Sequence, residues 1–380
     1  MKLVFPVRSE YRFAWQEGNR FTLLIDGTQF FPAMLAAMRG ATRFIALEMY
    51  LFESGDIATR IIDALSAAAQ RGVVVHVLLD HYGSLALHDA DRARLRSSGA
   101  RLHFYNPLAV ASWRRSLYRD HRKILIADGQ FAYVGGAGIT DEFITMNGHP
   151  GWRETMVEVR GPVVGDWCAL FAEAWQRYSG KAFSVDYPPV RDAGTQRGRV
   201  VSNQARGPWE IHRSILNRMR SARRHAWLAT AYFVPSWKLR RALRFAGRAG
   251  TDVRLLLPGP LSDHPGVSHA GRRHYGGLLR HGVRIYEYQP RFMHQKVLLC
   301  DGWASIGSSN VDRWGQRWNL EANQEIDDAG FALEVAAMLQ ADFAQAQEIT
   351  YTNWRQRSWS RRFLEKFWGR IDTLLQRLER

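Results

Sequence analysis

The segment DHRKILIADGQFAYVGG at residues 120–136 decides the fold, because the chain repeats its pattern as MHQKVLLCDGWASIG at 293–307. Each copy places His and Lys two positions apart, adds four residues and ends the run with Asp-Gly. An Asp-Gly pair between apolar runs is typical of a β-hairpin turn. The sequence therefore predicts two matching hairpins, one in each half of a duplicated chain.

Within each copy, the His and Lys side chains share one face of the strand, because neighbouring side chains alternate between faces. The Asp that follows has the opposite parity, which favours a turn or scaffold role over an acid role in the site. Two hairpins packed about a pseudo-twofold axis bring two imidazoles and two ammonium groups to one point. The motif residues form the candidate catalytic set, which is His121, Lys123, Asp128, His294, Lys296 and Asp301.

Such a set suits a phosphodiester. The lysines neutralise the nonbridging oxygens as charge builds toward five-coordinate phosphorus. One histidine attacks phosphorus and the other protonates the leaving oxygen, so the scheme needs no metal and no other cofactor. A histidine in either role is oriented by a carboxylate on its other ring nitrogen. Glu154 and Glu321 are the candidates, since each follows a motif histidine at a similar interval on an apparent strand.

A small-residue turn follows the second motif as Gly307, Ser308, Ser309 and Asn310. Glycine permits close backbone approach, and the Ser and Asn side chains can donate to phosphate oxygens. We therefore expect Ser308 and Asn310 to bind the substrate phosphate.

Strands alternate with helices around both motifs. Residues 43–80 and 224–257 each read as strand, helix and strand, and further strands are expected at 100–107 and 283–290. The Pro-, Gly- and charge-rich stretch 184–200 is the candidate linker. The pattern predicts an α/β fold of two tandem pseudo-symmetric domains, each a mixed sheet flanked by helices, with one active site shared at their interface.

We expect the first domain to span 1–190, the second 191–350 and a tail 351–380. The tail spaces its aromatic and aliphatic residues near the helical period and fills the gaps with Arg and Lys. One interpretation is an amphipathic helix in a membrane interface. The other is a terminal helix that packs on its own domain.

Composition sets the broad class. The chain has 380 residues, 46% hydrophobic content and a formal net charge of +16, which favours anionic partners. Cys168 and Cys300 sit in apolar segments and are expected to be reduced core thiols. No apolar run is long enough for a signal peptide or a membrane span. The sequence predicts a cytoplasmic protein whose membrane contact is peripheral.

At this point the chain resembles the phospholipase D superfamily, whose members carry two HxKxxxxD motifs followed by GGxN or GSxN. Within it, stretches such as FIALEMYLF, LATAYFVP and IGSSNVDRWGQRWNLEAN are similar to bacterial cardiolipin synthases of the subtype without N-terminal transmembrane helices. The resemblance implies that His121 is the nucleophile and His294 the general acid, then base. It also implies phosphate binding by Lys123, Lys296 and Asn310. The first motif departs from the pattern, because Gly138 stands where Asn is expected.

The implied reaction is phosphatidyl transfer between two phosphatidylglycerol molecules, giving cardiolipin and glycerol through a phosphatidyl-histidine, at the cytoplasmic face of the bacterial inner membrane. The basic and aromatic stretch 113–119 could grip anionic headgroups, or be an ordinary basic loop. Hydrolysis of phospholipid or nucleic acid is the alternative activity, and a noncatalytic binding module is a third. Aromatic residues that could exclude water from the site are Phe104, Tyr105, Trp113, Tyr232, Phe233 and Phe292.

Overall fold

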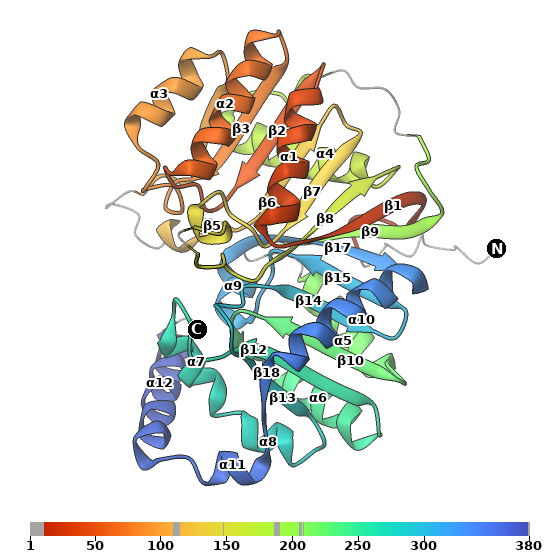
Figure 1. The fold of residues 1–380 in the computed structure, drawn as a ribbon, viewed down its shortest axis with the longest axis vertical. Helices are drawn as coiled ribbons and strands as arrows, with labels where there is room; N and C mark the ends of the chain where they lie inside the picture. The colour runs from red at the N-terminus through yellow and green to blue at the C-terminus, as the bar shows by residue number, and fades with distance from the viewer. Residues whose placement is uncertain are drawn as a thin grey trace, which may run out of the picture.

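One mixed β-sheet runs through the whole molecule in the computed structural model (Figure 1). The two halves meet where β1 (Gln16–Ile25) pairs antiparallel with β9 (Gln196–Asn203). The two predicted sheets are thus joined edge to edge into one. The structure describes residues 11–108, 115–146, 148–185, 191–204, 207 and 209–378.

The strand order is the same on both sides of this junction. Outward through the first half it runs β1, β8 (Thr155–Arg160), β7 (Phe131–Gly135), β6 (Lys123–Ala127), β2 (Phe44–Met49), β3 (Val74–Asp80) and β4 (Arg101–Tyr105). Through the second half it runs β9, β17 (Asn319–Asp327), β15 (Trp303–Gly307), β14 (Lys296–Cys300), β10 (His225–Thr230), β12 (Asp252–Pro258), β13 (Arg284–Tyr288) and β18 (Ala346–Ile349). The predicted duplication is therefore visible in the sheet itself.

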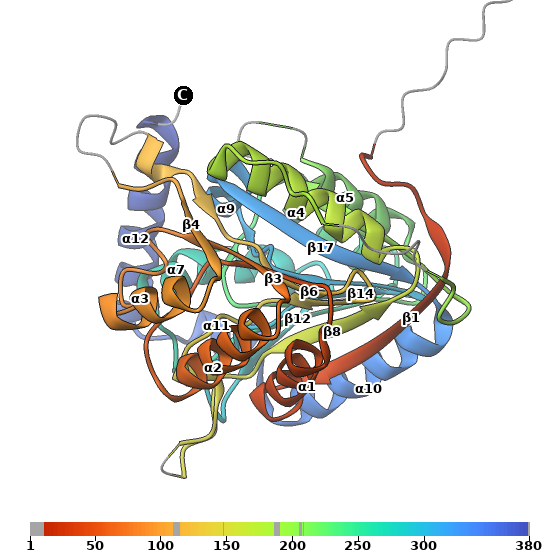
Figure 2. The same cartoon turned by 90° about the horizontal axis from the view of Figure 1, so that it is seen from above.

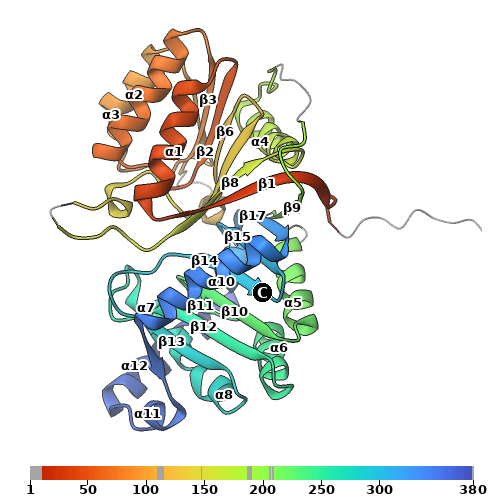
Figure 3. The ribbon, with the colours of Figure 1, turned by 45° about the vertical axis from the view of Figure 1, so that its right-hand side comes forward.

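Helices cover both faces of the sheet (Figures 2 and 3). In the first half, α1 (Gly27–Gly40), α2 (Asp56–Gln70) and α3 (Asp89–Ser97) are followed by α4 (Val164–Ser179) on the opposite face. In the second half, α5 (Glu210–Ser221) and α6 (Trp237–Arg248) lie opposite α10 (Ala329–Ala344). The α2 stripe of Ile57, Ile61, Ile62 and Leu65 is fully buried, as the helical period predicts.

Short elements complete the chain near the junction of the halves. They are the 3-10 turns Arg115–Leu117 and Asp141–Phe143, the strands β5 (Arg119–Asp120), β11 (Phe233–Val234) and β16 (Val311–Asp312), and the helices α7 (Pro265–Arg272), α8 (Tyr275–Leu279) and α9 (Arg313–Trp318). The predicted strand, helix and strand units at 43–80 and 224–257 are confirmed. The expected linker 184–200 is wrong at its end, because β9 begins at Gln196; residues 186–190 lie outside the described part of the chain.

The tail folds back onto the second half. After β18 come α11 (Tyr351–Arg355) and α12 (Trp359–Leu378), and α12 packs against α7. The packed-helix interpretation therefore holds for one face of α12. Cys168 and Cys300 are buried free thiols, as expected. Within the described residues, none of the helices combines the length and the apolar character needed to cross a bilayer.

Candidate active site

Each motif histidine is carried across to the opposite half by a short parallel pairing. Strand β5 lies against β17, and the His121 N–H donates to the carbonyl of Leu320 at 3.0 Å. In the mirror arrangement, Arg153 bridges to Met293, and the His294 N–H donates to the Arg153 carbonyl at 2.8 Å. The backbone thus sends each histidine toward the strand that carries the other half's carboxylate.

The two histidine–carboxylate pairs are therefore crossed between the halves. Nδ1 of His121 lies 3.1 Å from Oε2 of Glu321, and Nδ1 of His294 lies 2.6 Å from Oε2 of Glu154. The intervals along the chain had matched each carboxylate with the histidine of its own half, and the structure corrects that pairing. A carboxylate on Nδ1 holds the proton there and leaves Nε2 free to act on substrate.

Burial controls the protonation of both histidines. Both carboxylates are almost fully buried, and the His294 ring is 8% exposed. Burial lowers the pKa of His121, and the Glu321 charge opposes that shift. Burial and the charges of Lys296 and Lys123 lower the pKa of His294 well below its usual range. Neutral imidazoles are the form that a nucleophile or a general base requires.

The motif lysines lie beside their histidines. Nζ of Lys123 donates to the His121 carbonyl at 2.6 Å and lies 4.9 Å from the centre of the Tyr50 ring. Nζ of Lys296 lies 2.9 Å from Nδ1 of His294 and 3.6 Å from Glu154. Burial lowers the pKa of Lys123 to about 7 and raises the pKa of Glu154 to about 7. These groups titrate close to neutrality, so the site can change its charge in that range.

Asp128 and Asp301 are scaffold residues, which corrects their place in the candidate catalytic set. The Asp128 carboxylate accepts hydrogen bonds from three consecutive backbone N–H groups at residues 42–44, at 2.8 to 2.9 Å. Asp301 does the same for residues 223–225 at 2.9 to 3.0 Å. Each Asp therefore fixes the start of the strand beside its hairpin, as the strand parity had indicated.

Ser308 and Asn310 occupy different environments. The hydroxyl of Ser308 donates to Oε2 of Glu321 at 2.5 Å and also lies 3.3 Å from the Ala322 carbonyl. It holds the carboxylate in place, and its role as a phosphate ligand stays a prediction. Asn310 lines the cavity described below, and its Oδ1 lies 3.5 Å from the Thr230 hydroxyl. Its amide group remains the candidate phosphate donor.

The first half is closed where the second half carries Asn310. A Cβ atom on Gly138 would lie 2.7 Å from Cβ of Leu51 and 3.0 Å from its carbonyl oxygen. Such distances leave no room for a larger side chain without movement of Leu51. The departure from the motif at Gly138 is thus built into the packing of the first half.

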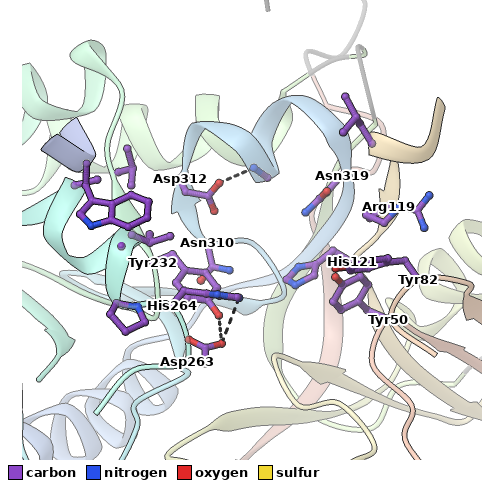
Figure 4. A pocket seen from close by; sticks show the side chains of 18 of the residues that line it. Tyr50, Tyr82, Arg119, His121, Tyr232, Asp263, His264, Asn310, Asp312 and Asn319 are labelled. Carbon is purple, nitrogen blue, oxygen red and sulfur yellow. Dashed lines mark hydrogen bonds and ion pairs between the residues drawn. The ribbon is translucent and has the colours of Figure 1, made fainter. Parts of the chain in front are cut away.

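A cavity of about 1010 Å³ opens onto this arrangement (Figure 4). His121 and Asn310 line it, and the crossed pairs place His294 behind Tyr232, with 6.3 Å between the two ring centroids. Of the aromatic residues expected to exclude water, Tyr232 lines the cavity, Phe292 lies against the His294 ring, and Trp113 falls outside the described residues. Other lining residues are Tyr50, Tyr82, Arg119, Val234, Asp263, His264, Val267, Ala270, Trp368 and Ile371.

A buried ion network locks the halves together beside Glu154. The Arg153 guanidinium donates to Asp342 of α10 at 3.0 and 3.1 Å and to Asp26 at 3.0 Å. Arg291 donates to the same Asp26 oxygen at 2.5 Å, and the other Asp26 oxygen accepts from the Glu154 N–H at 3.2 Å. The motifs gave no signal for these residues, because their partners lie in the opposite half of the chain.

Metal-binding clusters can be assessed for the described ranges. There, no group of three or more His, Cys, Asp and Glu side chains is arranged to hold a metal ion.

Comparison with known proteins is consistent with this geometry. The family model described as the cardiolipin synthase, phospholipase D-like domain matches residues 34–175 and 215–346. Cardiolipin synthase A of Pseudomonas aeruginosa is 34% identical over 339 residues, covering 87% of this chain and 68% of that protein. Cardiolipin synthase B of Salmonella typhimurium is 35% identical over 328 residues, covering 83% and 78%.

Solved structures share the fold. The phosphatidylserine synthase of Haemophilus influenzae superposes with a TM-score of 0.74 at 13% identity, covering 93% of this chain and 94% of that one. The polyphosphate kinase of Porphyromonas gingivalis gives a TM-score of 0.61 at 16% identity over 88% and 49%. These two likenesses establish the architecture alone. Taken with the curated relatives, the duplicated motifs and the matched family model show that this chain belongs to the cardiolipin synthase family of phospholipase D-like phosphatidyltransferases.

Proposed function

We propose that the chain is a cardiolipin synthase that moves a phosphatidyl group from one phosphatidylglycerol to the headgroup hydroxyl of another, releasing glycerol. The observation that supports this proposal most directly is the crossed pairing of two buried histidines with two buried carboxylates beside one cavity, which is lined by His121 and by Tyr232, whose ring centroid lies 6.3 Å from that of His294. Double displacement at phosphorus needs one nucleophile and one acid–base group on opposite sides of a single phosphate.

In the first step, Nε2 of His121 forms a bond to phosphorus while the bond from phosphorus to the glycerol oxygen breaks. That oxygen takes a proton from Nε2 of His294 and leaves as glycerol; His294 enters this step as the imidazolium, which the anionic phosphodiester and Glu154 favour. In the second step, His294 removes the proton from the acceptor hydroxyl, whose oxygen bonds to phosphorus. The phosphorus–nitrogen bond breaks, and its electron pair returns to the His121 imidazole.

The surroundings supply the electrostatic part of catalysis. Lys123 and Lys296 are buried cations, so their charges act on the nonbridging oxygens with little screening by water. Asn310 adds a donor from the second half. Glu321 and Glu154 stabilise each imidazolium as it forms. One diester bond replaces another, so the reaction consumes no nucleotide.

The apolar part of the cavity wall is suited to lipid acyl chains. Val234, Val267 and Ala270 of the second half line it together with Trp368 and Ile371 of α12. The Trp368 ring lies directly against Gly266, where a Cβ would come within 3.0 Å of it. We propose that the diacylglycerol portion of the donor lies along this wall.

The outer face of α12 supports peripheral binding to the cytoplasmic face of the inner membrane. Trp359, Phe363 and Phe367 are 82%, 61% and 47% exposed and recur every fourth residue. Exposed cations flank them at Arg361, Arg362, Lys366 and Arg370, whereas the acidic Glu365 is buried and paired with Arg357. Aromatics beside cations are the composition that binds anionic lipid surfaces.

The direct test of this function uses the purified full chain, phosphatidylglycerol vesicles and EDTA, with products followed by mass spectrometry. The proposal expects cardiolipin and glycerol. Phosphatidic acid as the sole lipid product would instead support hydrolysis, and cleavage of single-stranded DNA without lipid turnover would support a nuclease. Loss of activity on chelation would contradict the metal-free scheme.

The membrane surface is tested separately with point changes. Deletion of the tail is unsuitable, because Trp354 of α11 covers Gly276 of α8. Serine at Trp359, Phe363 and Phe367 should weaken co-sedimentation with phosphatidylglycerol vesicles by about tenfold or more. Serine at the exposed Trp237, Phe245 and Leu333 on other helices is the matched control. Equal loss of vesicle binding in both triple variants would contradict a specific role of α12 in membrane binding.

A further inference from the structure

Two polar side chains line the cavity beside His294 and belong to neither histidine–carboxylate pair. The Tyr232 hydroxyl donates to Oδ2 of Asp263. Figure 4 shows this pair on the other side of the cavity from Tyr50 and His121. The Asp263 side chain is 24% exposed, so part of its carboxylate is open to the cavity. The Asp263 carboxylate has no role in the two-step reaction proposed above.

Asp263 acts electrostatically on the second-half catalytic groups. Burial lowers the pKa of His294 and of Lys296, and the Asp263 charge opposes that lowering in both. Coulomb interactions fall with distance and with exposure to water, so this influence places Asp263 within the same charged environment. Tyr232 donates to Asp263, and its ring centroid lies 6.3 Å from that of His294, so a ligand atom bound to Asp263 lies beside His294.

The chemistry of this pair identifies what it binds. A carboxylate repels phosphate oxygens, but it has about four lone-pair positions; the Tyr232 hydroxyl donates to Oδ2, and Nε2 of the exposed His264 lies 3.8 Å from the same oxygen. The remaining positions are suited to O–H donors. An ammonium group would also pair with Asp263, but Lys123 and Lys296 are buried nearby and disfavour a further cation. A neutral alcohol with more than one hydroxyl fits the pair best.

The first half has no matching pair at the equivalent strands. In the first half, Met49 pairs with Lys123, and Leu51 lies two positions further along the chain. In the second half, Thr230 pairs with Lys296, and Tyr232 lies two positions further along. The nearby carboxylate of the first half, Asp80, is fully buried and accepts from the N–H groups of Gly83 and Asp120 at 3.0 and 2.9 Å. The Arg119 guanidinium also donates to Oδ1 of Asp80 at 3.3 Å, so the Asp80 oxygens are committed to backbone N–H groups and to this ion pair.

We propose that Asp263 and Tyr232 form the subsite for the hydroxyl groups of the alcohol that leaves and enters the phosphatidyl group, and that they select a neutral polyol. This inference rests on the proposed transferase function. Because the subsite adjoins His294, the exchanged oxygen lies on that side of phosphorus. This position agrees with the acid–base role that the proposed function gives to His294.

The test is a competition between acceptors in one reaction. The purified full chain receives phosphatidylglycerol together with deuterated glycerol, 1-propanol and ethanolamine at equal concentration. Mass spectrometry then gives the ratio of labelled phosphatidylglycerol to phosphatidylpropanol and phosphatidylethanolamine. The ratio is internal to each reaction, so a loss of folded protein does not change it. The variants are Asp263→Asn and Tyr232→Phe.

The control is Asp312→Asn, which removes another carboxylate that lines the cavity. Asp312 caps α9 by accepting from the Gly315 N–H, and Asn caps helices equally well. We expect wild type to prefer glycerol, and both subsite variants to lower the glycerol-to-propanol ratio by about tenfold or more, since a site built for hydroxyls rejects an analogue that lacks them. The control should stay within about twofold.

Three results would overturn the inference. An unchanged ratio in the subsite variants would give the pair a structural role, an equal fall in the control would indicate a general charge effect, and a wild-type preference for ethanolamine would make Asp263 a cation site. The proposed function fails independently if wild type makes no cardiolipin. A glycerol preference that depends on Asp263 would survive that failure.

Discussion

The first half and the second half place their motif lysines on equivalent strands, yet the side chains around each lysine differ. Met49 pairs in register with Lys123, whereas Thr230 pairs with Lys296. At the next equivalent positions, Leu51 and Gly138 of the first half replace Tyr232 and Asn310. At these two positions the first half is thus apolar and closed, and the second half is polar and open to the cavity.

This difference teaches which parts of a duplicated site are free to diverge. Both halves keep His, Lys and Glu, because each phosphorus needs a nucleophile on one side and an acid–base group on the other. In the proposed reaction the walls of the two halves contact different substituents of that phosphorus, so they need not match. We therefore propose that the asymmetry reflects the orientation of the substrate.

Loss of either motif histidine should block the step that this histidine catalyses, which is attack on phosphorus for His121 and protonation of the leaving oxygen for His294. We expect His121→Ala and His294→Ala each to lower transfer by roughly 10⁴-fold or more. The two variants should differ with a phosphatidyl ester of p-nitrophenol, which leaves without protonation. His294→Ala should then release a stoichiometric burst of p-nitrophenol by absorbance, and His121→Ala should release none. A burst from His121→Ala alone would exchange the two roles.

Loss of the negative charge of either crossed carboxylate should have the next largest effect on activity. Glu321→Gln should slow formation of the covalent intermediate at His121, and Glu154→Gln should slow departure of glycerol at His294, each by about 10²- to 10³-fold. Glu158→Gln is the control. Glu158 lies on β8, the strand that begins directly after Glu154, and its carboxylate accepts from Tyr133 and Arg160 outside the site. Rapid-quench kinetics separates the two steps. Each carboxylate acting on the histidine of its own half would contradict the crossed arrangement.

The pH dependence of activity tests the charges of Glu154 and Lys123. Activity requires ionised Glu154 and protonated Lys123, whose pKa values burial moves to about 7 from opposite directions. The carboxylate appears as pH rises through about 7, and the ammonium is lost over the same range, so kcat/KM should be bell-shaped with its maximum near neutrality. A bound phosphodiester favours the ammonium, so the basic limb of kcat should lie at higher pH.

Lys123→Arg and Lys296→Arg show which half sets the basic limb, because a guanidinium stays charged. We expect the Lys123 variant to move that limb of kcat/KM upward. Profiles that are flat across neutrality, or a limb that moves only in the Lys296 variant, would contradict the assignment to the first half.

Restoring the motif in the first half should cost stability and add nothing. Gly138→Asn forces a Cβ against Leu51, and overpacking of this kind costs about 1–3 kcal/mol of unfolding free energy. Chemical denaturation measures this loss of stability. A rise in cardiolipin synthesis from Gly138→Asn would show that the first half still holds a phosphate-binding position.

Much of this arrangement follows from sequence, for physical reasons. Strand parity predicted that His121 and Lys123 share a face and that Asp128 does not. The helical period predicted the buried face of α2, and the repeated pattern predicted matching sheets. These are local rules, in which a side chain's position depends on its own strand or helix.

The features of the site that the sequence did not predict depend on contacts between segments that lie far apart in the chain. The crossing of Glu321 to His121 comes from the parallel pairing of β5 with β17, which no local pattern encodes. Ser308 meets that same carboxylate through the pairing of β15 with β17 inside the second half. Asp263 follows β12 in a segment without a motif, and its place beside Tyr232 comes from the folding of the second half, which no local pattern encodes.

The most direct measurement is peptide mapping of the trapped intermediate. The full chain is mixed with phosphatidylglycerol, quenched in cold alkali to preserve the phosphorus–nitrogen bond, and digested for mass spectrometry. The account predicts a phosphatidyl adduct on the peptide that contains His121, at reduced level in Glu321→Gln. An adduct on the peptide that contains His294, with none on His121, would contradict it.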